Sequence, residues 1–142
     1  MPITCSEEFE DVLKKRILVV EDHAAVRQGI VETLNRESDL MVCGEAEDMS
    51  SALELISAAP PDLVLIDIQL KSSSGLSLIR VLHQQHPELP TIGMTMFDPV
   101  HYEKKARAAG VCGFVVKQEG PVKLLAAIRA ALFAKPQSTD SK

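Results

Sequence analysis

Leu63-Val-Leu-Ile-Asp67 places four consecutive apolar residues directly before an aspartate. A continuous apolar run of this kind is typical of a strand in a parallel sheet that is covered on both faces. Four other short runs share this apolar character: Ile17–Val20, Met41–Cys43, Thr91–Met94 and Gly113–Val116. The sequence therefore predicts five strands along the chain.

A stretch with helical spacing follows each predicted strand. Val26, Ile30 and Leu34 recur at i, i+4 and i+8 after the first strand, as on the apolar face of a helix. The other four stretches run through residues 52–56, 78–82, 100–109 and 124–132. Gly110 follows the fourth of these helices and suits a left-handed C-terminal cap. Five strand-then-helix units in succession predict an α/β protein with a parallel sheet and helices on both faces.

Length and composition suit one globular domain. The chain has 142 residues, of which 46% are hydrophobic and 25% are charged, and these values argue against wholesale disorder. We expect 1–15 to be an N-terminal extension, 16–135 the folded domain and 136–142 a polar tail. Within the extension, the spacing of Phe9, Val12 and Leu13 predicts a short amphipathic turn or helix.

The sequence carries no signal for a membrane or for export. No apolar run approaches the roughly 18–20 residues that cross a bilayer, and the N-terminus lacks the basic head and apolar stretch of a secretory signal. The cysteines, Cys5, Cys43 and Cys112, are too widely spaced for a CxxC or zinc motif. We therefore expect a cytoplasmic protein with free thiols.

The net charge is −5, and the sequence has no basic cluster. This chain alone is therefore a poor candidate for direct binding of nucleic acid.

Polar side chains collect where the predicted strands end. Glu21 and Asp22 follow the first strand, Asp67 follows the third, Thr95 ends the fourth and Lys117 follows the fifth. Because the carboxyl ends of parallel strands share one edge, where α/β proteins bind ligands, these side chains are expected to meet. Three carboxylates placed together repel one another unless a cation compensates them. Mg²⁺, which prefers oxygen ligands, is the natural cation, with Mn²⁺ as an alternative.

This set of groups matches the needs of phosphoryl transfer. A carboxylate can attack phosphorus to give an aspartyl phosphate, a lysine ammonium can hold a phosphoryl oxygen, and a threonine hydroxyl can donate to another. Each residue alone has a simpler interpretation, such as an acidic pair at a helix N-terminus or an aspartate that caps a turn. Their placement at the ends of four different strands favours the interpretation that they form a site for phosphoryl transfer.

The combination resembles the response-regulator receiver domain of bacterial two-component signalling, over about Arg16–Ala134. The resemblance rests on Ile17–Asp22, on Leu63–Asp67 with Gly75 eight residues later, on Met94-Thr95 and on Ala109–Lys117. These motifs are most similar to those of receivers of the NarL/FixJ type. The resemblance to the receiver family implies a flavodoxin-like fold, with a five-stranded parallel sheet of order 2-1-3-4-5.

The resemblance also implies a role for each matching residue. Asp67 is the phosphoacceptor. Asp22 binds Mg²⁺ directly, Glu21 binds it through a water, and the backbone carbonyl of Gln69 completes the protein ligands together with Asp67.

Two residues hold the phosphoryl group and two form the switch. Lys117 and Thr95 bind the phosphoryl group in this interpretation. Thr95 shifts on phosphorylation, and Phe114 is the switch aromatic that changes rotamer with it.

The sequence departs from the family pattern at two positions. Lys71 stands where the family commonly has a proline, so we expect the loop 71–75 to be more mobile and to carry an extra cation near the site. Gln118 stands where many receivers have a second proline.

The predicted function is a Mg²⁺-dependent phosphoacceptor that receives its phosphoryl group from the phosphohistidine of a histidine kinase or phosphotransfer protein. It promotes its own phosphorylation and dephosphorylation but is not a turnover enzyme. A flavodoxin-type phosphate site is excluded by the repulsion of Glu21 and Asp22. A dehalogenase-type phosphatase is disfavoured by Gln69, and no phosphate loop for a nucleotide hydrolase exists.

The output of the receiver has two interpretations. In the first, a stand-alone receiver acts through protein contacts or a phosphorelay. In the second, this is the receiver of a NarL/FixJ-type transcription factor, and a helix-turn-helix outside this chain binds DNA. A homodimer through the first and fifth helices, or through the fourth and fifth, is compatible with either.

Overall fold

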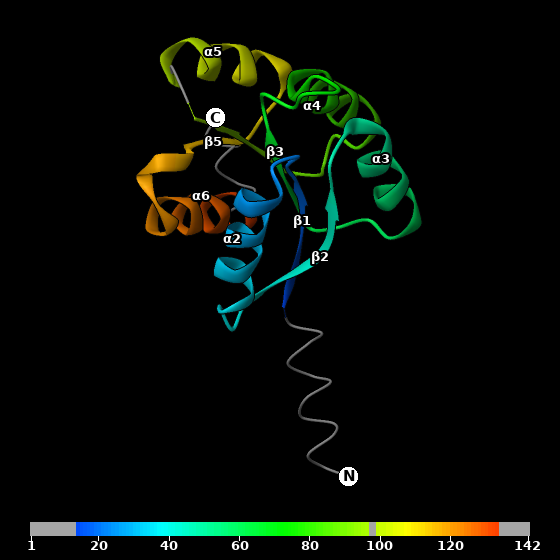
Figure 1. The fold of residues 1–142 in the computed structure, drawn as a ribbon. Helices are drawn as coiled ribbons and strands as arrows, with labels where there is room; N and C mark the ends of the chain where they lie inside the picture. Colours follow the sequence, from blue (N-terminus) through cyan, green and yellow to red (C-terminus); the bar gives the residue numbers. More distant parts are fainter. Residues whose placement is uncertain (1–13, 97–98, 134–142) are drawn as a thin grey trace, which may run out of the picture.

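Five parallel strands form one sheet in the computed structural model, which describes residues 14–96 and 99–133 (Figure 1). The strands are β1 (Lys15–Val20), β2 (Leu40–Ala46), β3 (Leu63–Asp67), β4 (Thr91–Thr95) and β5 (Gly113–Val116). Their order is β2-β1-β3-β4-β5, and every neighbouring pair is parallel. The predicted fold class and strand order are therefore confirmed.

Helices connect the strands and cover both faces of the sheet. They are α2 (Ala24–Asn35), α3 (Met49–Ala58), α4 (Gly75–Gln85), α5 (Pro99–Ala109) and α6 (Pro121–Phe133). A 3₁₀ turn, η1 (Lys117–Glu119), follows β5 and has no counterpart among the predicted elements. Figure 1 shows α2 and α6 together on one side of the sheet, with α3, α4 and α5 on the other.

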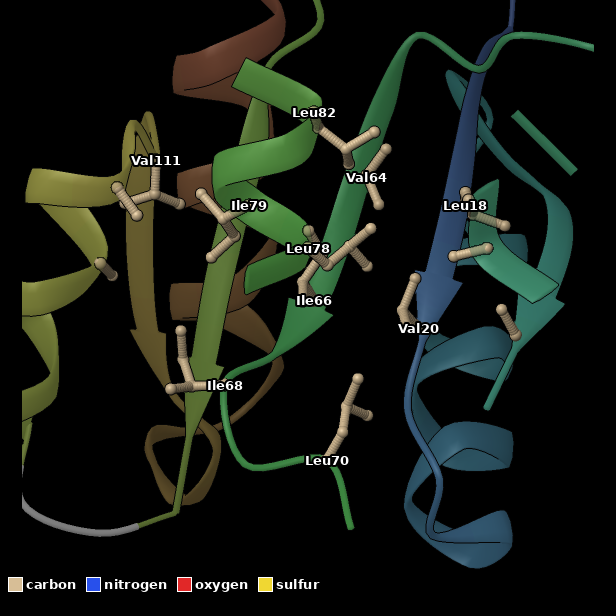
Figure 2. Packing of buried hydrophobic residues seen from close by; sticks show 14 of the residues in the cluster. Leu18, Val20, Val64, Ile66, Ile68, Leu70, Leu78, Ile79, Leu82 and Val111 are labelled. Atoms are coloured by element: carbon tan, nitrogen blue, oxygen red, sulfur yellow. The ribbon is translucent and has the colours of Figure 1, made fainter. Parts of the chain in front are cut away.

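Alternate residues of each central strand enter two separate cores. Leu18 and Val20 of β1 point into the core beneath α3, α4 and α5, whose packing is drawn in Figure 2. Ile17 and Val19 point into the core beneath α2 and α6. All four residues are at most 2% exposed, as expected for a strand with both faces covered. The continuous apolar run is thus explained by two cores that share one strand.

Capping groups set the ends of several helices. Gly110 has φ +115°, and its N–H and that of Val111 bond to the carbonyl of Ala106, which confirms Gly110 as the end of α5. Asp48 caps the start of α3 by accepting the N–H of Ser51 at 2.9 Å. Ser74 does the same for α4, with the N–H of Ser77 at 3.2 Å.

Gly75 brings the first turn of α4 directly against the end of β3. A Cβ at this position would overlap the carbonyl oxygen of Asp67 and lie 2.8 Å from Ile68 Cα. The Gly75 N–H also donates to the carbonyl of Ile68 at 3.3 Å. A side chain here would push α4 away from the strand end that carries Asp67.

The predictions for the two ends of the chain and for the cysteines can be compared with the structure only in part. The amphipathic turn around Phe9, the polar tail and Cys5 lie outside the described residues, and β1 begins at Lys15. Cys43 and Cys112 are free thiols. None of the helices within 14–96 and 99–133 is long and apolar enough to cross a bilayer.

Candidate functional site

The fold gathers the predicted site residues at the carboxyl edge of the sheet. β1 and β3 are neighbours, so the loop after β1 lies beside the end of β3. Glu21, Asp22, His23 and Asp67 each offer one side-chain ligand atom, and these atoms lie within 4.8 Å of one another. Two of the carboxylates, Glu21 and Asp67, are at most 2% exposed. Burial of ionised carboxylates is unfavourable unless they are paired or hydrogen-bonded.

Lys117 supplies part of that compensation. Its Nζ lies 2.6 Å from Glu21 Oε1 and 3.2 Å from Asp67 Oδ2, and the lysine side chain is itself only 9% exposed. Lys117 follows β5, at the far end of the sheet from β2, and spans β4 to reach these acids. One ammonium cannot neutralise three carboxylates, so the site keeps an excess of negative charge.

Asp67 is held by a backbone donor as well as by the lysine. The Gln69 N–H donates to Asp67 Oδ1 at 2.9 Å, while Oδ2 faces Lys117. Burial raises the pKa of Asp67, and the adjacent Glu21 carboxylate also raises it. The Gln69 hydrogen bond and the Lys117 charge act in the opposite direction and offset part of the increase.

Asp22 has one oxygen anchored and one without a hydrogen bond. Asp22 Oδ2 accepts the backbone N–H of Lys71 at 2.6 Å. Among the described residues, Asp22 Oδ1 is a buried side-chain oxygen that accepts no hydrogen bond, although His23 Nδ1 lies 3.3 Å away. A buried, orphaned carboxylate oxygen beside two further carboxylates fits a hard divalent cation.

His23, which directly follows the acidic pair in the sequence, contacts both of its carboxylates. Its Nδ1 lies 3.3 Å from Glu21 Oε2, and its backbone N–H donates to the same oxygen at 3.2 Å. The ring is about half exposed at the mouth of the site. His23 therefore lies within hydrogen-bond distance of Glu21 and is one of the four residues whose ligand atoms cluster here.

Thr95 and Gln69 contact each other across the sheet edge. Thr95 Oγ1 donates to Gln69 Oε1 at 3.2 Å. The sequence placed Thr95 at the site but assigned Gln69 only a backbone role, so this side-chain contact was missed. Gln118, one of the departures from the family pattern, donates from Nε2 to the carbonyl of Met96 at 2.6 Å and thereby links η1 to the end of β4.

Phe114 lies beside Gly93 on the neighbouring strand. The two residues are register partners, and a Cβ at Gly93 would lie 3.3 Å from Phe114 Cδ1 and 2.9 Å from Ile68 Cδ1. The half-buried ring packs against the core beneath α3, α4 and α5. Side chains two residues apart on a strand share a face, so Thr95 lies on the same face as this packing.

Arg27 of α2 supports the loop that carries the acidic pair. Its Nη1 donates to the backbone carbonyl of Glu21 at 2.7 Å, and its Nε donates to Glu45 Oε1 at 2.9 Å. The acidic residues at the end of β2 and just beyond it therefore have structural partners: Glu45 and Glu47 face Arg27, and Asp48 caps α3. An arginine one turn into a helix gave no sequence signal for this role.

Comparison with known proteins identifies the family. Residues 17–129 match the family model for the response regulator receiver domain, and the chain belongs to this family. It is similar to a solved two-component response regulator of the LuxR family from Aurantimonas sp. SI85-9A1, with a TM-score of 0.81 and 31% identity, covering 86% of this chain and 87% of that one.

Curated relatives are longer than this chain. The response regulator GacA of Pseudomonas viridiflava is 32% identical over 114 residues, which are 80% of this chain and 53% of GacA. The DNA-binding transcriptional activator DevR/DosR of Mycobacterium tuberculosis is also 32% identical over 114 residues, covering 80% of this chain and 52% of that protein. The chain thus spans about half the length of these relatives.

Asp67→Asn is expected to increase the stability of the metal-free protein at neutral pH. Burial raises the pKa of Asp67, so stability falls as the pH rises from the aspartate pKa of the unfolded chain, and the full cost is present above the raised pKa. Below the pKa of an aspartate in the unfolded chain, the carboxyl is protonated in both states and the advantage of the variant should vanish. Urea unfolding across this pH range, with EDTA present, measures the difference.

Asp39→Asn is a matched control with the opposite sign. The two Asp39 carboxylate oxygens accept hydrogen bonds from Arg129 at 2.8 and 3.0 Å, and these bonds lower the pKa of Asp39. Its ionised form stabilises the fold at neutral pH, and this contribution is lost as the pH falls through the lowered pKa. The exchange should therefore decrease stability at neutral pH. Equal or lower stability of Asp67→Asn there would contradict the description of Asp67 as a buried, costly charge.

Proposed function

We propose that Asp67 accepts a phosphoryl group from the phosphohistidine of a histidine kinase or phosphotransfer protein, in a reaction that depends on Mg²⁺. The observation that supports this most directly is the pairing of a buried Asp67 with Lys117 beside two further carboxylates. Small phosphodonors such as acetyl phosphate are expected to serve too, because the receiver supplies the catalytic groups. The domain performs one transfer at a time and is not a turnover enzyme.

Asp22 and Asp67 are the proposed direct protein ligands of Mg²⁺, with Glu21 acting through a water and the Gln69 backbone carbonyl completing the set. The orphaned Asp22 Oδ1 and the oxygen-rich donor set support this assignment. The bound ion neutralises the carboxylates and the phosphoryl oxygens that approach them. Mn²⁺ has the same ligand preferences and is expected to substitute.

The transfer forms a bond between a carboxylate oxygen of Asp67 and phosphorus while the P–N bond of the donor breaks. The imidazole nitrogen keeps the electron pair of that bond. Lys117 Nζ, now shared between Glu21 and Asp67, faces the position that a phosphoryl oxygen on Asp67 would take. Thr95 exchanges its hydrogen bond with Gln69 for one to the phosphoryl group.

Movement of Thr95 couples the site to the surface in this proposal. Phe114 packs on the same face of the sheet, beside Gly93, so a shift of Thr95 changes the space available to the ring. A two-state equilibrium biased in this way reshapes the face formed by α5, β5 and α6. That face, or the one formed by α2 and α6, is the proposed homodimer surface. A cytoplasmic location is part of the same proposal, since it follows from the proposed signalling partners.

Incubation with acetyl phosphate and Mg²⁺ is expected to add one phosphoryl group to the wild-type chain, detected by intact-protein mass spectrometry. Asp67→Asn should gain none, and EDTA should abolish labelling of the wild type. Asp62→Asn is the matched control, since Asp62 precedes β3 at the opposite edge of the sheet and accepts the Arg16 N–H at 2.8 Å. Labelling of Asp67→Asn at the wild-type rate would refute the phosphoacceptor assignment, and labelling unaffected by EDTA would refute the metal requirement.

A second proposal concerns the output. The relatives that match over 80% of this chain are about twice the matched length, and one of them is named a DNA-binding transcriptional activator. We propose that this receiver controls a DNA-binding effector of the NarL/FixJ type that lies outside the chain. A stand-alone receiver, which acts through protein contacts, is the alternative.

A gel-shift assay distinguishes the two outputs. The chain alone is expected to shift no promoter DNA, because it is acidic and offers no basic cluster. The product of the complete open reading frame is expected to shift DNA from its own promoter region, more strongly after treatment with acetyl phosphate. An open reading frame that ends with this sequence, and whose product binds no DNA, would favour the stand-alone receiver.

A further inference from the structure

The loop between β3 and α4 contributes a backbone donor to the acidic site. The Lys71 N–H donates to Asp22 Oδ2 at 2.6 Å, across 49 positions of sequence. Proline has no N–H, so this hydrogen bond requires that residue 71 is not the proline of the usual family pattern. The departure at position 71 therefore creates a contact that the family pattern does not allow.

The same loop is anchored at other points, which fixes the donor in place. Ser73 Oγ accepts the N–H of Met49 at 3.1 Å, and Ser74 caps α4 through the N–H of Ser77. Gly75 then packs against the end of β3. These contacts tie the loop to α3, α4 and the site, and the mobility of loop 71–75 stays a prediction from the sequence.

The hydrogen bond from Lys71 makes the two carboxylate oxygens of Asp22 different from each other. Oδ2 is engaged by Lys71, whereas the buried Oδ1 accepts no hydrogen bond from the part of the chain that the structure describes. An Asp22 carboxylate freed from Lys71 could turn about its side-chain bonds, toward His23 or the solvent. Donors that orient a metal-ligating carboxylate typically change metal affinity by about 10–100-fold when they are removed.

We propose that the backbone N–H of Lys71 is a positioning group of the metal site, which holds Asp22 Oδ2 so that Oδ1 is presented to the ion. This inference rests on the proposed metal site and adds a group that no side chain supplies. The exposed Lys71 side chain has no part in it.

Lys71→Pro and Lys71→Ala separate the N–H from the side chain. Both remove the ammonium, but only Lys71→Pro removes the backbone donor. Binding of Mn²⁺ to the full 142-residue chain, followed by electron paramagnetic resonance, is expected to weaken about tenfold in Lys71→Pro and to stay within about twofold of wild type in Lys71→Ala. Circular dichroism verifies that each variant is folded.

Equal affinity of Lys71→Pro and wild type would overturn the proposal, as would an equal loss in both variants. A wild type without saturable Mn²⁺ binding would instead refute the metal site itself, and the positioning role with it.

Amide hydrogen exchange tests the contact even if Lys71→Pro does not fold. In metal-free protein, the Lys71 amide is expected to exchange about tenfold faster in Asp22→Ala than in wild type, because a hydrogen bond to a charged acceptor is lost. The Met49 amide, bonded to Ser73 in the same loop, is the internal reference and should not change. An unchanged Lys71 exchange rate would overturn the proposal.

Discussion

Lys117 Nζ lies between two buried carboxylates, 2.6 Å from Glu21 and 3.2 Å from Asp67, and the rest of the site depends on this arrangement. Each carboxylate alone would be expensive to bury, and loss of the lysine they share would leave both without its charge, a change that commonly costs about 3–5 kcal/mol for a buried pair. The strand order makes the pairing possible because β1, β3 and β5 deliver the three residues to one edge. The sheet topology is therefore the first requirement of the chemistry.

Lys117 neutralises only part of the negative charge of the carboxylates, and the charge that remains can attract a cation. A third carboxylate, Asp22, adds charge that Lys117 does not neutralise, and burial still raises the pKa of Asp67. The surplus charge favours a divalent cation and a reaction in which positive groups gather around phosphoryl oxygens. Backbone groups near the acids, such as the N–H of Gln69 and of Lys71, orient the carboxylates without neutralising them.

The strands and most of the residues that meet at the sheet edge could be predicted from the sequence, and the reason is physical. Continuous apolar runs such as Leu63–Ile66 mark strands between two cores, and residues at the ends of parallel strands must share an edge. This reasoning brought Asp67 and Lys117 together correctly. It could not find the Lys71 N–H, the Gln69 side chain or Arg27, because their contacts depend on loop conformation and rotamers that no periodicity encodes.

The central claim is that this edge binds a metal ion and a phosphoryl group at Asp67. A crystal structure of the chain with Mg²⁺ and beryllofluoride, a tetrahedral mimic of a phosphoryl group, tests it most directly. We expect beryllium bonded to an Asp67 oxygen, a fluoride in contact with Lys117 Nζ and another with Thr95 Oγ1, and Mg²⁺ on Asp22, Asp67 and the Gln69 carbonyl. Beryllofluoride on another carboxylate, or Lys117 still paired with Glu21 and remote from the fluorides, would contradict it.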